Sequence, residues 1–166
     1  WSISKGMEIL PRVADLAPII ETPCETYEEC KTLSRATGLP MMLDEVMSGP
    51  EVMRQAAADG IIQSAVLKMS CTGGLRRHRQ MLDVAQRHGI PCRIEDFYGT
   101  GLTLAAVSHL AQSLPAAATF ALYDYHNPDV PVVHNPFRVE QGRVKVPADC
   151  LPGLGVEVNE DLLGAP

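Results

Sequence analysis

The sequence predicts an α/β fold with about five βα units around a parallel sheet, followed by a C-terminal tail of β-like character. Two observations support this prediction. Short apolar runs alternate with helix-like segments at intervals of roughly twenty-odd residues, which is the pattern of parallel strands joined by crossover helices. Charged residues end several of these runs, as expected where the C-terminal ends of parallel strands open onto a cavity.

The N-terminal segment, residues 2–16, is predicted to be an amphipathic helix. Ile3, Met7 and Leu10 recur at helical spacing and would form one apolar face. Proline lacks the amide hydrogen that a helix interior uses, and its ring clashes with the preceding turn. We therefore expect a break or a kink at Pro11.

Five short apolar runs are predicted to form the strands of the sheet. Each is short enough for a buried strand and is bounded by residues that end helices or begin turns. In chain order they are residues 18–21, 41–44, 65–68, 91–95 and 120–123. Because strands separated by helices pair in parallel, their C-terminal ends are expected to meet at one edge of the sheet.

Cap and turn residues mark the ends of the helices between these strands. Thr26 followed by Glu29 fits a capping box, and this helix is expected to end at Gly38. The next helix is expected to begin at Ser48 or Gly49, just before a proline in its first turn. The helices that follow the second, third and fourth strands are predicted at residues 48–60, 75–88 and 103–113.

The chain changes character at Asp124, where it becomes rich in proline and polar residues. A turn with a short strand is predicted at 141–147, and another at 152–158. Proline cannot continue a helix or a central strand, so this region is not expected to add another βα unit. We therefore divide the chain into a βα domain at residues 1–123 and a C-terminal tail at residues 124–166.

Composition excludes several classes of protein. Hydrophobic residues make up 46% of the chain and charged residues 20%, which is typical of a globular protein rather than a disordered one. The net charge of −6 argues against a nucleic-acid surface. No apolar run approaches the roughly 20 residues that a membrane helix needs. We expect neither nucleic acid nor a membrane as a partner.

The cysteines and the N-terminal residues indicate the cellular compartment of the protein. The five cysteines are odd in number and scattered, without a Cys-x-x-Cys pair, which predicts reduced thiols in a cytoplasmic protein. Trp1 begins an amphipathic stretch without the basic and apolar regions of a secretory signal. Because the first residue is not methionine, the chain is expected to be processed or cut from a longer protein.

Two carboxylates end consecutive predicted strands. Glu21 follows the first apolar run and Asp44 follows the second, so both are expected to point into one partly desolvated space. Like charges repel there, and a bound cation is the natural resolution. Oxygen ligands favour Mg²⁺ over zinc or copper. The alternative is that each residue caps the following helix or pairs with a nearby base.

Lys68 ends the third apolar run. A lysine at the end of an apolar strand is costly unless it is paired or functional. Near cations its pKa would fall toward the range of a working base. The alternative is a lysine that only forms a salt bridge with Glu45 or Asp44.

Residues at the end of the fourth strand are candidates for substrate binding. Asp96 could point into the same cavity and hold a cationic group, or it could be a local cap ahead of Gly99. Tyr98 could line a pocket or pack in the core. The histidines show no metal-ligand spacing, and His78 and His88 are expected on the exposed side of their helix.

The order of these motifs resembles the enolase superfamily, and more narrowly the mandelate racemase and muconate lactonizing enzyme group. The segments that carry the resemblance are Ile-Ile-Glu-Thr-Pro at 19–23, Met-Leu-Asp-Glu at 42–45, Val-Leu-Lys-Met-x-x-x-Gly-Gly-Leu at 66–75 and Pro-Gly-Leu-Gly-Val-Glu-Val at 152–158. Hydroxyproline betaine epimerases and cis-3-hydroxyproline dehydratases look most similar.

The resemblance implies roles for particular residues. Glu21 and Asp44 would be the second and third ligands of a Mg²⁺ ion. Glu45 would be a partner of this site that does not itself bind the metal ion. Lys68 would be one of two lysines that act as acid and base on the α-carbon of a carboxylate substrate. Asp96, where hydroxyproline betaine epimerases place an ammonium-binding aspartate, would bind the substrate together with Tyr98.

The reaction that the resemblance implies is removal of the α-proton through a metal-stabilised enediolate, a chemistry known for enolase-type sites. Return of the proton from the other face gives racemisation or epimerisation, and loss of a β-hydroxyl gives dehydration. The implied substrate is an amino acid or a proline-type compound.

The resemblance also implies that the chain is incomplete. The first metal ligand, the second lysine and an N-terminal capping domain would all lie before Trp1. The five units would then form a partial TIM-type (β/α) barrel, whose full form has eight strands. Strand edges near Ile20 and Leu122 would be unpaired. We expect a homo-oligomer or a missing N-terminal half to cover them.

Two rival hypotheses remain at this stage. The chain could be a catalytically incompetent fragment that acts only as a structural or assembly module. It could also belong to an unrelated α/β barrel enzyme, such as an aldolase that forms a Schiff base at Lys68.

Overall fold

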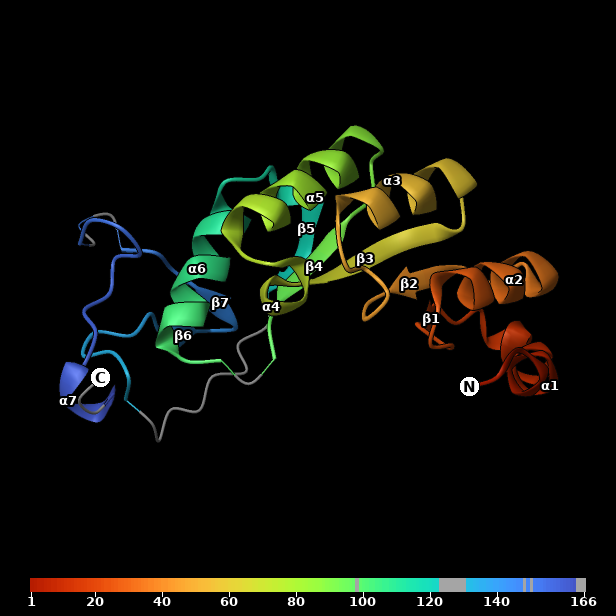
Figure 1. The fold of residues 1–166 in the computed structure, drawn as a ribbon, viewed down its shortest axis with the longest axis horizontal. Coiled ribbons are helices and arrows are strands. Elements are labelled where there is room, and N and C mark those ends of the chain that lie inside the picture. Colours follow the sequence, from red (N-terminus) through yellow and green to blue (C-terminus); the bar gives the residue numbers. More distant parts are fainter. Residues whose placement is uncertain (98, 123–130, 148, 150, 164–166) are drawn as a thin grey trace.

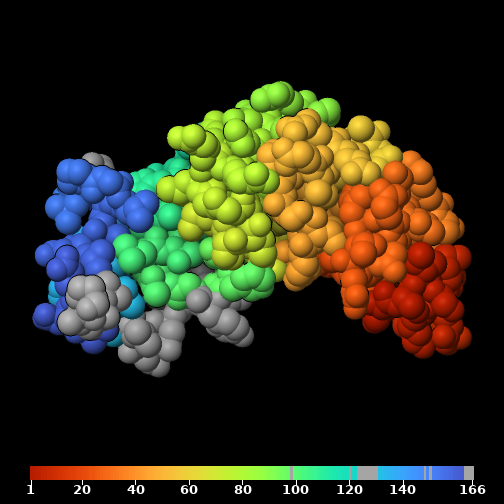
Figure 2. Space-filling view, in the orientation of Figure 1, coloured from red at the N-terminus to blue at the C-terminus, as the bar shows by residue number. Residues whose placement is uncertain are grey.

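The computed structural model describes residues 1–97, 99–122, 131–147, 149 and 151–163. Its elements follow one another across the molecule in chain order, from α1 at one end to the C-terminal tail at the other (Figure 1). The space-filling view shows the same succession along an arched body (Figure 2). The predicted α/β fold is confirmed.

A five-stranded parallel sheet forms the centre of the molecule, with its strands in chain order β1-β2-β3-β4-β5. The strands are β1 (Ile20–Glu21), β2 (Met41–Leu43), β3 (Ile62–Lys68), β4 (Cys92–Glu95) and β5 (Thr119–Leu122). The third strand is longer than the predicted run at 65–68. The predicted end of the fifth strand, Tyr123, lies outside the described residues.

Helices connect these strands and cover the sheet on one side (Figure 1). The long helices are α1 (Ile3–Val13), α2 (Tyr27–Thr37), α3 (Pro50–Asp59), α5 (Leu75–Arg87) and α6 (Gly101–Gln112). A one-turn helix, α4 (Met69–Thr72), directly follows β3 and was not predicted. Two short 3₁₀ segments lie at Ala14–Leu16 and Ala116–Ala118. None of the described helices is long and apolar enough to cross a membrane.

Local signals set the helix ends as predicted. Thr26 and Glu29 form a capping box at the start of α2. Gly38 and Gly60 end α2 and α3, each with φ of +68°, a left-handed conformation that favours glycine. Pro50 occupies the first turn of α3.

Of the break or kink expected at Pro11, a break does not occur, because α1 continues through this residue and ends two residues later at Val13. Proline in the last turn removes a single hydrogen bond close to the point where the helix ends anyway. Packing compensates for it: Leu10 is buried, and Gly6 lies so close to Leu33 of α2 that a β-carbon there would come within 2.4 Å of the leucine side chain. Tertiary contact therefore overrides the local helix breaker.

The core lies between the sheet and the helices that cover it. Its fully buried large side chains include Met41, Leu43, Leu67 and Ile94 from the strands, and Leu33, Met53, Met81, Leu82 and Leu104 from the helices. In β3 every residue from Ser64 to Lys68 is buried, so this strand is covered on both faces. A polar side chain at the end of such a strand must therefore find polar partners.

The described part of the tail has a different structure from the βα units. Strands β6 (Val139–Glu140) and β7 (Arg143–Val144) form an antiparallel hairpin, as the turn predicted at 141–147 requires. The second predicted strand is reduced to one antiparallel bridge between Val133 and Val158, followed by α7 (Glu160–Leu163). A contact of 3.0 Å between His109 Nε2 and the Leu154 carbonyl fastens the tail to α6.

Four of the five cysteines are described, and each has a free thiol: Cys24, Cys30, Cys71 and Cys92. Burial raises the pKa of Cys92 to about 12, so this thiol stays protonated. It is therefore a core residue rather than a nucleophile.

Candidate active site

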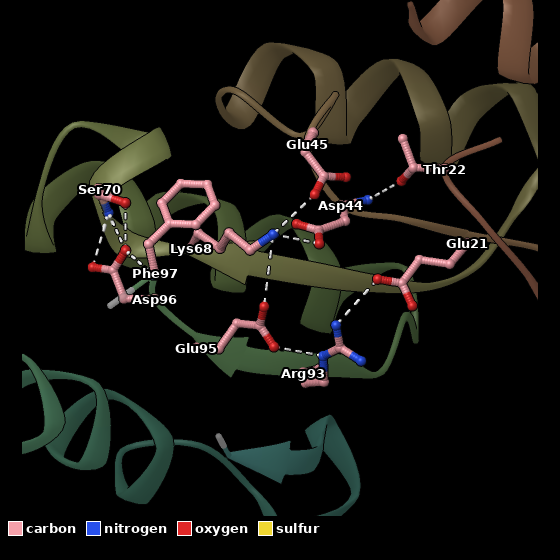
Figure 3. A network of polar contacts seen from close by, with 10 residues as sticks. All are labelled: Glu21, Thr22, Asp44, Glu45, Lys68, Ser70, Arg93, Glu95, Asp96 and Phe97. Carbon is pink, nitrogen blue, oxygen red and sulfur yellow. Dashed lines mark hydrogen bonds and ion pairs between the residues drawn. The ribbon is translucent and has the colours of Figure 1, made fainter. Parts of the chain in front are cut away.

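The C-terminal ends of β1 to β4 open onto a cavity of about 260 Å³. Its lining residues are Glu21, Asp44, Lys68, Arg93, Glu95, Asp96 and Phe97. Figure 3 shows these side chains converging from four strands and from the loop after β4. The structure thus brings together three of the charged residues that the sequence predicts for the site, Glu21, Asp44 and Lys68.

The parallel register pairs Lys68 directly with Glu95 across β3 and β4. It staggers the ends of β1 and β2 along the sheet, because Glu21 pairs with Met42 and Met42 with Ser64. Thr22 ties the ends of β1 and β2, because its hydroxyl accepts a hydrogen bond of 2.7 Å from the backbone amide of Asp44. Thr22 has φ of +29°, outside the usual range for its residue type, and such strain is typical of functional sites.

Lys68 lies among carboxylates. Its Nζ is 2.5 Å from Asp44 Oδ2, 3.1 Å from Glu45 Oε1 and 3.7 Å from Glu95 Oε1. The Phe97 ring lies on a further side, with its centroid 4.7 Å from Nζ, which is within cation–π distance. The side chain of Lys68 is only 8% exposed, so these contacts replace its water.

In this structure the neighbours of Lys68 raise its pKa, and the fall expected near a cation stays a prediction. Burial alone lowers this pKa, but hydrogen bonds to Asp44 and Glu45 outweigh burial and raise it to about 12. The prediction assumed cationic neighbours, whereas the structure supplies carboxylates. Burial raises the pKa of Asp44 to about 6, with Glu45 acting in the same direction and the Lys68 hydrogen bond opposing both.

A second part of the ion-pair network joins β1 to β4. Arg93 Nη2 lies 3.2 Å from Glu21 Oε1, and Arg93 Nε lies 2.7 Å from Glu95 Oε2. The side chains of Arg93 and Glu95 are 15% and 3% exposed. Burial raises the pKa of Glu95, although Arg93 and Lys68 oppose this shift. The network is continuous from Glu21 to Asp44 (Figure 3).

The donor set of this network fits a divalent cation. Glu21, Asp44, Glu45 and Glu95 supply four negative charges against two positive charges on Lys68 and Arg93, a formal net charge of −2. Asp44 Oδ1 is buried without a hydrogen-bond partner among the described residues. A buried carboxylate oxygen without a partner is a natural ligand for Mg²⁺.

The described part of the chain does not complete a metal site. Within it, no three side chains of the His, Cys, Asp and Glu types are grouped closely enough to hold a metal ion. Glu21 and Asp44 end adjacent strands and line one cavity, so they can supply two ligands. A third protein ligand would have to come from elsewhere.

Asp96 lines the cavity and also caps a helix, α4, rather than the turn ahead of Gly99 that was the alternative considered for it. Its carboxylate accepts hydrogen bonds from the Ser70 backbone amide at 3.2 Å, from the Ser70 hydroxyl, and from the Phe97 amide at 2.8 Å. It is therefore a local cap at the start of α4, although it also lines the cavity. Tyr98, the other predicted substrate-binding residue, lies outside the described residues.

Sequence reasoning missed Thr22, Ser70, Arg93 and Phe97. A usable signal existed for Arg93, because it precedes Glu95 by two positions on one strand and therefore shares its face. No local pattern marks Phe97, whose position over Lys68 depends on the loop after β4.

A larger hollow of about 620 Å³ lies in the tail between His134 and Gly155. Its charged lining residues, among them Arg138, Glu140 and Lys145, are exposed. Ion pairs between exposed charges are well solvated and contribute little energy. The smaller strand-end cavity is the better candidate, because its charged side chains converge and three of them, Asp44, Lys68 and Glu95, are buried.

His78 is fully buried on α5, so its predicted exposure is wrong. Nδ1 lies 3.3 Å from the Thr72 hydroxyl of α4, and Nε2 has no hydrogen-bond partner among the described residues. Burial lowers the pKa of His78 to about 4, and the negative charge of Asp96 opposes this shift only weakly. The imidazole is therefore neutral at pH 7.

This burial predicts acid lability. The unfolded histidine binds a proton near its ordinary pKa of 6.5, whereas the folded one does so near 4, so stability is lost as pH falls between these values. We expect a loss of about 3 kcal/mol. Chemical denaturation from pH 7 to 4 should show a flatter profile for His78→Leu. The exposed control His88→Gln should follow wild type, and an unchanged profile in His78→Leu would contradict the assignment.

Comparisons with known proteins agree with the geometry. The sequence model of the family described as enolase C-terminal domain-like matches residues 1–162. Cis-3-hydroxy-L-proline dehydratase from Roseibium aggregatum is 36% identical over 167 residues, covering 100% of this chain and 45% of the relative. Muconate cycloisomerase 1 from Rhodococcus opacus is 32% identical over 173 residues, covering 97% of this chain and 44% of the relative.

Solved structures show the same relationship. A mandelate racemase/muconate lactonizing enzyme from Roseovarius nubinhibens ISM superposes with a TM-score of 0.90 at 32% identity, covering 100% of this chain and 45% of that one. An enolase-superfamily member from the same organism, complexed with magnesium, gives 0.87 at 31% identity with the same coverage. This chain therefore spans less than half the length of these relatives.

Proposed function

Because this chain belongs to the enolase C-terminal domain-like family, we propose that it is the C-terminal part of a Mg²⁺-dependent enzyme that removes the α-proton of a carboxylate substrate. The observation that carries the proposal is Lys68. It is a buried ammonium group on an inner strand, beside Asp44, at the strand end where such barrels place their chemistry.

Glu21 and Asp44 would hold the metal ion. Both end adjacent strands and face one cavity, and Asp44 offers an oxygen that has no other partner among the described residues. A bound Mg²⁺ ion would stabilise the negative charge that develops on the substrate carboxylate when the α-proton leaves. Mg²⁺ is supported by the relative that was solved with magnesium.

Lys68 would exchange the proton at the α-carbon. Its raised pKa keeps it as an ammonium group in this structure, the form that delivers a proton. To accept a proton it must first lose one, which becomes easier when additional positive charge offsets the carboxylates around it. Glu45 would help to position Lys68 by its hydrogen bond of 3.1 Å.

The substrate class that we propose is an amino acid or a proline-type compound. The similarity to a cis-3-hydroxy-L-proline dehydratase supports it. Asp96 lines the cavity as an acidic group that can attract a substrate ammonium, and Phe97 supplies an apolar wall. Tyr98, which follows Phe97 in the sequence, is proposed as a further substrate-binding residue. Proton return would give an epimer, whereas loss of a β-hydroxyl as water would give a dehydrated product.

The remaining parts of such a site would come from the half of the protein outside this chain. The chain covers 45% of its dehydratase relative, and only two metal ligands are proposed here. We therefore propose that the five βα units are part of a larger (β/α) barrel. A non-catalytic structural module is the competing function, and it is compatible with a chain that spans 45% of its dehydratase relative.

Exchange of the α-proton in D₂O tests this proposal. The full-length protein containing this chain is incubated with Mg²⁺ and proline, cis-3-hydroxyproline, hydroxyproline betaine or dipeptides, and the α-proton signal is followed by NMR. Loss of the signal for one class, abolished by EDTA, supports the enzyme. Silence on every carboxylate contradicts proton abstraction and leaves the structural module.

A further inference from the structure

Arg93 makes an ion pair that crosses the inner face of the sheet. It extends from β4, and its partner Glu21 ends β1, although β2 and β3 lie between these strands. The two residues are 72 positions apart in the chain. Such a contact requires the curvature of the sheet, which brings the ends of β1 and β4 toward one another (Figure 3).

In each of the two proposed metal ligands, one carboxylate oxygen contacts a basic side chain. Asp44 has one oxygen, Oδ2, held by Lys68, and its other oxygen has no partner in the described part of the chain. Glu21 likewise has one oxygen, Oε1, held by Arg93. A carboxylate held by one oxygen presents the second in a defined direction, which is how supporting residues orient metal ligands.

The guanidinium of Arg93 is itself fixed. Its Nε lies 2.7 Å from Glu95, whose side chain is 3% exposed and whose other oxygen lies 3.7 Å from Lys68. Glu21 is different, because its side chain is 41% exposed and could adopt other rotamers without this contact. The largely buried ion pair of Arg93 and Glu95 therefore restrains the more exposed ligand.

We propose that Arg93 is a positioning residue that holds Glu21 in the orientation needed to bind the metal ion. The proposal rests on the proposed function of Glu21 as a ligand and extends it. Arg93 contacts Glu21 with one nitrogen and Glu95 with another. A planar guanidinium can make both contacts at once, whereas the single nitrogen of a lysine cannot occupy both positions.

The affinity for Mn²⁺, a probe for the Mg²⁺ site, tests this role without requiring turnover. Titration calorimetry of the full-length protein compares wild type with Arg93→Met, Arg93→Lys and Arg54→Met. Loss of a residue that orients a ligand weakens metal binding about 10- to 100-fold. We expect such a loss for Arg93→Met, a smaller loss of about threefold for Arg93→Lys, and none for Arg54→Met, whose arginine is exposed on α3.

Equal or tighter Mn²⁺ binding by Arg93→Met would overturn the proposal, because Arg93 would then only compete with the metal for Glu21. If thermal unfolding shows that Arg93→Met does not fold, the Mn²⁺ affinity of Arg93→Lys becomes the test. An affinity equal to that of wild type would then overturn the proposal. The variant Glu21→Gln tests the metal site itself, separately from the role of Arg93. If wild type does not bind Mn²⁺, or Glu21→Gln binds it equally well, the proposed metal site fails as well.

Discussion

Replacement of Lys68 by arginine is expected to lower the rate of α-proton exchange by about 10²- to 10⁴-fold, the usual contribution of a general acid or base. Arginine keeps a positive charge beside Asp44 and Glu45 but is not deprotonated in proteins. The measurement is exchange in D₂O by the full-length protein, followed by NMR on the substrate that wild type exchanges.

The choice of arginine follows from the burial of the pair. The side chains of Lys68 and Asp44 are 8% and 4% exposed. Removal of one partner from a buried ion pair costs about 3–5 kcal/mol, so Lys68→Ala would confuse lost chemistry with lost folding. Lys68→Arg should unfold close to wild type in a thermal scan. Wild-type exchange by a folded Lys68→Arg variant would contradict the catalytic role of this lysine.

The 166-residue chain expressed alone is expected to self-associate. Its sheet ends at β1 and β5, and strand edges without a partner pair readily with other chains. Beside β1 lies an apolar groove of about 600 Å³. Trp1, Leu16 and Ile19 line it with exposed fractions of 56%, 73% and 51%. Apolar surface of this kind favours association with a second copy of the chain.

Sedimentation velocity over a range of concentrations checks this expectation. The double variant Leu16→Lys with Ile19→Lys should shift the population toward monomer, because charges beside an edge strand oppose pairing. Leu75→Lys is the matched control, since Leu75 is 44% exposed on α5 and lies outside the groove. A monomeric wild-type chain with one cooperative unfolding transition would contradict the prediction.

Much of the fold could be predicted because its signals are local. The capping box at Thr26, the glycines that end α2 and α3, and the apolar runs of the strands act within a few residues. Pro11 misled the prediction because a local helix breaker was weighed without the packing of α1 on α2. The helix α4 was missed because one turn of helix has too few residues for a periodic pattern.

In the candidate site, too, some features follow from local sequence and others depend on the folded chain. From the sequence alone, Glu21, Asp44 and Lys68 could be placed at the ends of neighbouring parallel strands, facing one cavity. Three features could be seen only in the folded chain: carboxylates surround Lys68 and raise its pKa, Asp96 accepts hydrogen bonds from Ser70, and Arg93 contacts Glu21. The reason is physical: strand ends follow from local pattern, whereas burial and charge pairing depend on side chains brought together from distant parts of the chain.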